Sequence, residues 1–118
     1  MAESNNNTQN QLLTHIPPQA LEMEKSVLGS LMVDESGYDL VTDVLTPDSF
    51  YDKRHKLIYE AIRDLASADK PYDVLAVKDR LEKNGKIKHI GGMIYLSELL
   101  REANGSAGIR YYAEVIAE

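Results

Sequence analysis

The chain has 118 residues, 43% of them hydrophobic and 27% charged, and a formal net charge of −6; this composition is typical of one soluble globular domain that buries a core. It contains no cysteine, which excludes a disulfide framework, a thiolate nucleophile and a cysteine-based metal site. No apolar run approaches the roughly 20 residues needed to span a bilayer, and the first residues do not resemble a signal peptide. We therefore expect a cytoplasmic protein.

The amino-terminal third is predicted to contain a tail and two helices. Residues 1–15 are rich in Asn, Gln and Thr and offer little to bury, so we predict a disordered N-terminal tail there. A helix is predicted from Gln19 to about Val33, because apolar residues recur at helical spacing after Pro18, which a first turn tolerates. After a turn at residues 34–37, the apolar residues of Tyr38–Leu45 indicate a short second helix.

A strong helix start follows at Thr46-Pro47-Asp48, where a hydroxyl stands at the cap position, proline at the first position and an acid in the first turn. The helix is predicted to run to about Ala68. Phe50 and Tyr51 either begin this helix or form a short turn separate from it.

Three more helices are predicted in the second half of the chain. Asp73 caps the first of them, which Asn84-Gly85 ends as a left-handed stop. Gly91-Gly92 introduces the next, and a loop through Asn104-Gly105 leads to the last, which starts near Ile109. No segment alternates with period two, so we predict no strands and an all-α, compact orthogonal bundle of about six short helices.

Leu28, Ile62 and Leu99 lie on the apolar stripes of three different helices, and such stripes face a core. We therefore expect all three side chains to be buried. The apolar pattern of the last helix is still running at Glu118, so we interpret the chain as a fragment of a longer protein.

The sequence predicts no catalytic residue, no cofactor site and no metal site. The Gly-x4-Gly-Lys-Ser/Thr motif of ATP-binding phosphate loops is absent, and His15, His55 and His89 lack the spacing of metal ligands. We interpret His55 as a partly buried histidine with a backbone or water partner. Glu22 and Glu24, two positions apart, point to different faces of their helix and do not form one acid–base site.

Two basic clusters leave a nucleic-acid-binding alternative open. They comprise residues 53–56 (Lys53, Arg54, His55 and Lys56) and the lysines at positions 83, 86 and 88. Phosphate binding depends on such cations, but the net charge of −6 opposes it, and solvated helix faces explain the clusters better. A small helical DNA-binding module that uses residues 53–56 and Lys83–Lys88 remains the alternative function.

Five sequence blocks, spread in order over residues 16–118, carry a resemblance to a known family. The blocks lie at residues 16–29, 48–59, 71–77, 91–99 and 111–116; the fourth reads Gly-Gly-Met-Ile-Tyr-Leu-Ser-Glu-Leu and the fifth Tyr-Tyr-Ala-Glu-Val-Ile. Each block alone is weak, but five in the same order and near the same spacing make a specific match. Residues 16–118 resemble the amino-terminal domain of bacterial replicative DNA helicases, the DnaB family.

The resemblance implies a non-catalytic assembly and interaction domain. In the family, this helical domain forms the collar at one end of a hexameric ring, self-associates and helps to dock primase, and in some species a loader also engages the helicase. ATP, Mg²⁺ and DNA translocation belong to a motor domain that this fragment does not contain, so the full-length protein is expected to be an ATP-dependent DNA helicase. An enzyme of unfamiliar type is less favoured because no convergent polar cluster is evident in the sequence. An adaptor unrelated to helicases differs from this interpretation only in whether a motor domain follows in the intact protein.

The candidate interface residues are Tyr95, Tyr111 and Glu22. Tyrosine is amphipathic and suits protein interfaces, and the two tyrosines lie on helices that already have aliphatic residues for a core. Core and interface positions are equally consistent with this pattern. Our hypothesis for Tyr95 is that its ring is free to meet another chain, either a second collar subunit or primase.

Overall fold

The computed structural model describes residues 18–118; the predicted tail and His15 lie outside the described residues. The α-helices of the described part are α2 (Pro18–Val33), α3 (Lys53–Ser67), α4 (Val74–Lys83), α5 (Gly92–Arg101) and α6 (Ile109–Ala117), joined by short 3₁₀ turns η1 (Gly37–Leu40), η2 (Pro47–Ser49), η3 (Lys88–Ile90) and η4 (Ser106–Gly108). No strand occurs between residues 18 and 118, and the predicted all-α class is confirmed. None of these helices has both the length and the apolar character needed to cross a membrane.

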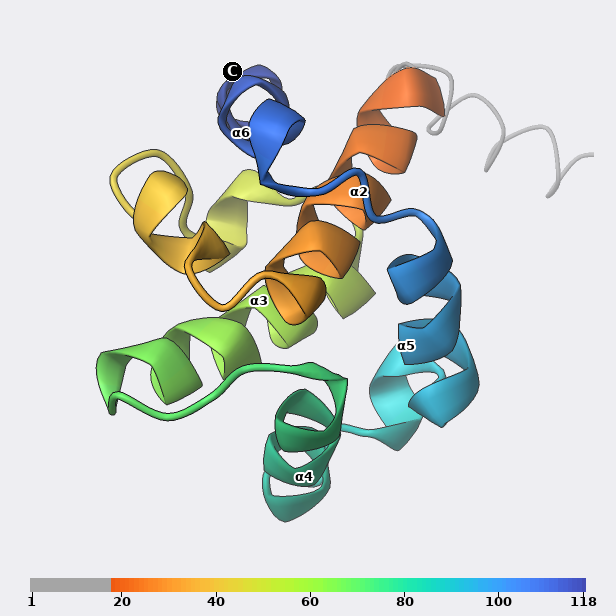
Figure 1. Ribbon diagram of the computed structural model, residues 1–118. Helices are drawn as coiled ribbons and strands as arrows, with labels where there is room; N and C mark the ends of the chain where they lie inside the picture. The colour runs from red at the N-terminus through yellow and green to blue at the C-terminus, as the bar shows by residue number, and fades with distance from the viewer. Residues whose placement is uncertain (1–17) are drawn as a thin grey trace, which may run out of the picture.

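Helix α2 forms the centre of the domain, because it packs against α3, α5 and α6 (Figure 1). The core lies around it, and the side chains of Leu28, Ile62 and Leu99 are fully buried, as predicted. Helices α2 and α5 approach each other closely at Gly29, where an added Cβ atom would lie 2.0 Å from the carbonyl oxygen of Leu99. Only a residue without a side chain fits at this crossing.

The segment between α2 and α3 differs from the prediction. Residues 38–45 do not form a second α-helix; η1 is followed by turns, with hydrogen bonds such as that from Val44 N–H to the Val41 carbonyl. Helix nucleation is costly, and this stretch is too short to repay that cost before the chain reaches Pro47.

The predicted helix start at Thr46 forms only the short 3₁₀ turn η2, and Phe50 and Tyr51 lie outside the main helix. Helix α3 begins at Lys53 because Asp52 caps it, accepting a 2.8 Å hydrogen bond from Arg54 N–H.

The boundaries of α4 agree with the prediction. The side chain of Asp73 caps the helix by accepting a 3.0 Å hydrogen bond from Ala76 N–H. At the other end Gly85 adopts the left-handed conformation, with φ of +71°, and the Lys86 N–H donates to the Leu81 carbonyl. This is the glycine stop that Asn84-Gly85 predicts.

Candidate interaction site

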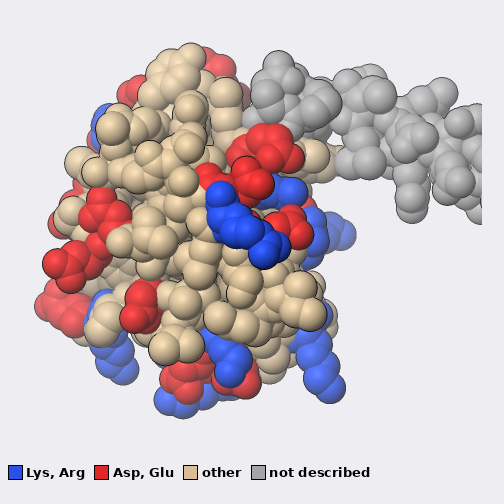
Figure 2. All heavy atoms as spheres, turned by 45° about the vertical axis from the view of Figure 1, so that its right-hand side comes forward, with Lys and Arg blue, Asp and Glu red and all other residues tan. Residues whose placement is uncertain are grey.

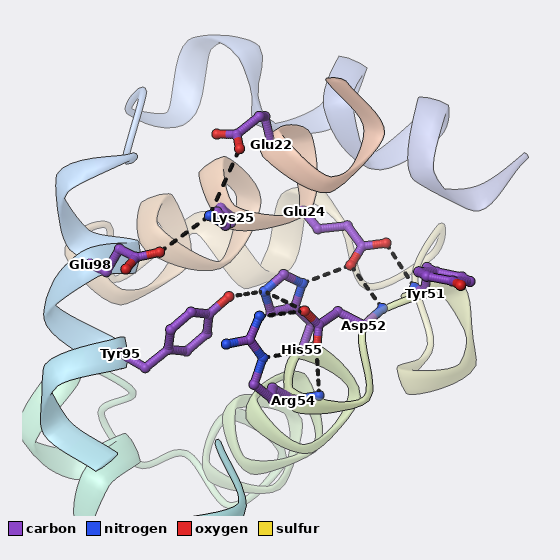
Figure 3. A network of polar contacts seen from close by, with 9 residues as sticks. All are labelled: Glu22, Glu24, Lys25, Tyr51, Asp52, Arg54, His55, Tyr95 and Glu98. Carbon is purple, nitrogen blue, oxygen red and sulfur yellow. Dashed lines mark hydrogen bonds and ion pairs between the residues drawn. The ribbon is translucent and has the colours of Figure 1, made fainter. Parts of the chain in front are cut away.

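A network of polar side chains lies where α2, the start of α3, and α5 meet (Figure 3). Glu24 of α2 is buried within it, with 3% of its surface exposed. The Glu24 carboxylate accepts hydrogen bonds from the backbone N–H groups of Tyr51 at 2.7 Å and Asp52 at 3.3 Å. A carboxylate of the central helix therefore holds the chain segment that leads into α3.

His55 joins Glu24 to α5. Its side chain is fully buried, with Nδ1 2.7 Å from Glu24 Oε1 and Nε2 2.6 Å from the Tyr95 hydroxyl. Nδ1 is at hydrogen-bond distance from the Glu24 carboxylate, whose oxygen accepts, and Nε2 is at hydrogen-bond distance from the Tyr95 hydroxyl. Both ring nitrogens are thereby used within the protein.

Arg54 covers Tyr95 on the outer side. The Tyr95 side chain is 7% exposed, and the Arg54 guanidinium lies 4.0 Å from the centre of its ring, within the range of a cation–π interaction. Nε and Nη2 of Arg54 also donate to the Asp52 carboxylate at 3.1 and 2.7 Å. The arginine is thus held between an aromatic face and a carboxylate.

Two pKa values in the network depart from their ordinary values. Burial raises the pKa of the Tyr95 hydroxyl to about 12. Burial also acts to raise the pKa of Asp52, but the hydrogen bonds from Arg54 and the electrostatic effect of the neighbouring His55 outweigh it, so the pKa of Asp52 lies below its usual value. Tyr95 is therefore protonated and Asp52 ionised at neutral pH.

A second group of ion pairs lies beside this network and nearer the surface (Figure 3). Lys25 Nζ lies 3.2 Å from Glu98 Oε2 on α5 and 3.8 Å from Glu22 Oε1. These side chains are partly exposed, and exposed pairs of this kind contribute only about 0–1 kcal/mol to stability. The buried members therefore dominate the energetics of the network.

The structure corrects two expectations about polar residues. A convergent polar cluster does exist, contrary to the sequence analysis, and His55 is fully rather than partly buried, with side-chain instead of backbone or water partners. The cluster resembles an acid–base array, but its imidazole is buried and both nitrogens are occupied. Within residues 18–118, no three His, Asp or Glu side chains are arranged to hold a metal ion. The arrangement connects three helices.

The three candidate interface residues lie in different environments. Tyr95 is buried beneath Arg54, so the expectation that its ring is free to meet another chain is wrong: its hydroxyl has a buried partner in His55, which an exposed position would not offer. Tyr111 on α6 is 63% exposed, and the side chain of Glu22 is 58% exposed. Whether any of the three residues contributes to an interface stays a prediction.

Acidic groups already engage two cations of the basic clusters. Arg54 pairs with Asp52, and Lys83 Nζ lies 3.0 Å from Asp79 Oδ2. On the face shown in Figure 2, acidic and basic side chains are interspersed rather than separated by sign. This mixture gives little support to a phosphate-binding surface, and the DNA-binding alternative stays a prediction.

Comparison with known proteins decides the family. The family model described as the DnaB-like helicase N-terminal domain matches residues 16–118. The chain therefore belongs to the DnaB-like helicase N-terminal domain family. Its fold agrees with a crystal structure of the N-terminal domain of DnaB helicase from Mycobacterium tuberculosis, with a TM-score of 0.80 and 36% sequence identity over 86% of this chain and 70% of that one.

Relatives of the DnaB-like domain are replicative helicases by name. The chain is 38% identical over 103 residues to the replicative DNA helicase DnaB of Rhodothermus marinus, and 34% identical over 103 residues to the replicative DNA helicase DnaC of Bacillus subtilis. Each match covers 87% of this chain, but only 11% and 23% of the two relatives. The chain thus spans a small part of their length.

Sequence reasoning missed Glu24, although a signal for it was present. Glu24 lies four residues after Ala20 and three before Val27, so it shares the apolar stripe of α2. A carboxylate on a buried stripe requires a partner inside the fold. The sequence did not reveal that the partner is His55, because that residue lies 31 positions away.

Proposed function

We propose that this DnaB-like domain is a non-catalytic assembly and interaction module of a hexameric replicative helicase. In this proposal it forms the N-terminal collar of the ring, self-associates and helps to dock primase, and a helicase loader is a further partner. The whole protein is then a cytoplasmic ATP-dependent DNA helicase that uses ATP and Mg²⁺ in a motor region outside these 118 residues, and DNA contacts the full ring.

The match to the DnaB-like domain over residues 16–118 is the observation that carries the proposal. The buried network supports it, because the one convergent polar cluster described above has no free imidazole for chemistry. Exposed apolar side chains supply contact area for partners: Tyr111 on α6 is 63% exposed and Ile94 on α5 is 83% exposed. Aromatic side chains of this kind are common anchors of protein interfaces.

Sedimentation over a concentration series tests the proposal directly. The 118-residue chain is measured alone and with the carboxy-terminal domain of primase from the same organism. We expect either self-association of the chain or a complex with the primase domain. A chain that stays monomeric at all concentrations and does not bind primase would contradict the proposal.

A pair of matched variants then locates the contact surface. Tyr111→Ala removes an exposed aromatic of α6, and Leu75→Ala removes a side chain of α4 with similar exposure, 66%. If Tyr111 anchors an interface, its removal weakens the association by about 1–2 kcal/mol or more, whereas Leu75→Ala leaves it unchanged. Equal effects of the two variants would show that Tyr111 is not a specific anchor. Glu22→Ala tests the remaining exposed candidate in the same assay.

A further inference from the structure

The chain contains two Asn-Gly pairs in its described part, Asn84-Gly85 and Asn104-Gly105, and both are solvent-exposed. Asparagine is chemically labile in proteins, and the pair Asn-Gly is the most reactive context because glycine has no side chain to shield its backbone nitrogen. That nitrogen attacks the side-chain amide carbon of the asparagine. The structure places the two pairs in different surroundings, and these surroundings determine which asparagine reacts faster.

The first pair is held by the end of α4. Asn84 has helical dihedral angles, φ −83° and ψ −3°, which turn the next backbone nitrogen away from its own side-chain carbon. The N–H of Gly85 donates a 3.0 Å hydrogen bond to the Glu82 carbonyl, and the N–H of Asn84 donates to Arg80. The attacking nitrogen is therefore tied to the helix, and attack requires the helix end to open.

The second pair lies in the irregular segment between α5 and η4. The N–H of Gly105 donates no hydrogen bond to any residue of the described part. Space around a Cβ atom added at either glycine is open among these residues, so the hydrogen bonds of the two glycines make the difference. Among residues 18–118, the Asn104 side chain has a single polar contact, 3.4 Å from Nδ2 to the Tyr112 hydroxyl, which is long for a hydrogen bond. The attacking nitrogen of this pair is thus not tied to a helix end, and its asparagine side chain is weakly held.

We propose that Asn104 is a site of spontaneous deamidation in this domain. The backbone nitrogen of Gly105 loses its proton and forms a bond to Cγ of Asn104, the Cγ–Nδ2 bond breaks, and the amide nitrogen takes up a proton and leaves as ammonia, which closes a five-membered succinimide. Water then adds to one of the two ring carbonyls and opens the ring to aspartate or isoaspartate. No electrons are transferred, and water is the only co-reactant.

The product changes the corner between α5 and α6 in two ways. It places a carboxylate two residues after Glu102, and the isoaspartate form adds a methylene group to the backbone. The backbone N–H of Asn104 donates a 2.9 Å hydrogen bond to Ser30 Oγ on α2, so the lengthened backbone lies directly beside a contact between the corner and the central helix. Protein isoaspartate methyltransferases recognise this linkage and methylate it, so such an enzyme can label the isoaspartate product specifically.

The experiment follows both pairs in one digest of the aged 118-residue chain. A glutamate-specific protease releases residues 83–98, whose only side-chain amide is Asn84, and residues 103–114, whose only side-chain amide is Asn104. Mass spectrometry measures the conversion of amide to acid in each fragment, and a protein isoaspartate methyltransferase labels the isoaspartate product. We expect residues 103–114 to convert several-fold faster than residues 83–98 in the folded chain.

The same chain in concentrated urea is the control, because the two pairs then differ little in structure and their rates should converge. Asn104→Gln, in which the longer side chain closes a ring much more slowly, should abolish the fast conversion and leave the rate at Asn84 unchanged. Equal rates in the folded chain, or faster conversion at Asn84, would overturn the proposal. So would an Asn104 that stays intact while the urea-treated chain reacts.

Discussion

Nδ1 of His55 lies 2.7 Å from Oε1 of Glu24, although the two residues are 31 positions apart in the chain. The same carboxylate receives the backbone N–H groups of Tyr51 and Asp52, so one side chain of α2 satisfies three donors at the entry to α3. Buried polar groups that lose a partner cost more than the hydrogen bond itself contributed. The pair therefore makes the position of α3 sensitive to a change of a single atom in Glu24.

Glu24→Gln tests this dependence. The amide has the shape of the carboxylate but has a single acceptor atom and carries its own N–H donors, so at least one buried donor loses its partner. We expect the free energy of unfolding to fall by about 1–3 kcal/mol, measured by urea denaturation. Glu22→Gln is the matched control on the same helix, and its exposed side chain should change stability by less than about 0.5 kcal/mol. Similar effects in both variants would contradict the role of the network.

Tyr95→Phe tests the buried hydroxyl at alkaline pH. Burial raises the pKa of Tyr95 to about 12, above the ordinary value of about 10 that the unfolded chain has. Between these two pKa values the folded state holds the hydroxyl proton more tightly than the unfolded state does. The stability that the protonated hydroxyl contributes is therefore complete below about pH 10 and is lost as the pH rises toward about 12. The wild-type chain should therefore lose more stability over this interval than Tyr95→Phe.

The measurement for Tyr95 compares urea midpoints of the two chains from neutral pH to about pH 12. Tyr59 and Tyr72, whose pKa values burial also raises, are present in both chains and cancel in the comparison. If the urea midpoints of the two chains fell in parallel as the pH rises, the pKa of the Tyr95 hydroxyl would not be raised by folding, which would contradict its burial. At neutral pH, Tyr95→Phe should already be less stable by about 0.5–1.5 kcal/mol, because Nε2 of His55 loses its partner.

Gly29→Ala tests the crossing of α2 and α5. Alanine normally favours a helix over glycine by about 1 kcal/mol, but here its Cβ would lie 2.0 Å from the Leu99 carbonyl oxygen. The helices must separate, and we expect a net destabilisation of about 1–3 kcal/mol or more, seen as a lower thermal midpoint. In Gly108→Ala the added Cβ would lie at an ordinary 3.5 Å from the Tyr112 ring, so it serves as the tolerated counterpart. A stabilised Gly29→Ala variant would mean that the crossing is looser than the structure has it.

Ile62→Ala tests the core. Ile62 is fully buried, and truncation of a buried isoleucine costs about 2–5 kcal/mol through lost burial and the cavity left behind. Leu75→Ala removes an aliphatic side chain that is 66% exposed, and it should be close to neutral. Chemical denaturation of both variants measures the difference, and equal stabilities would show that the apolar face of α3 does not carry the core.

The helices and their apolar faces could be predicted from the sequence because both depend on local properties. Asp73 caps α4 through an amide three residues away, and Gly85 ends it through its own backbone conformation; each effect acts within a turn of the helix. The stripe that buries Ile62 follows from the period of the α-helix alone. The second helix over residues 38–45 was predicted wrongly because a short apolar segment does not distinguish a helix from successive turns.

The polar network depends on the tertiary structure. Its members come from residues 24, 52–55 and 95, and no local rule pairs a carboxylate with an imidazole 31 positions away or a hydroxyl 40 positions beyond that imidazole. Tyr95 shows the same limit: its spacing was equally consistent with core and interface, and only the tertiary structure placed Arg54, at the start of α3, over its ring. The sequence by itself determined the five main helices and their buried apolar faces, since these depend on neighbours in the chain, and the order of its five blocks indicated the family. The tertiary structure decided the partners of the buried polar atoms, because hydrogen bonds depend on distances in space that only the packed helices define.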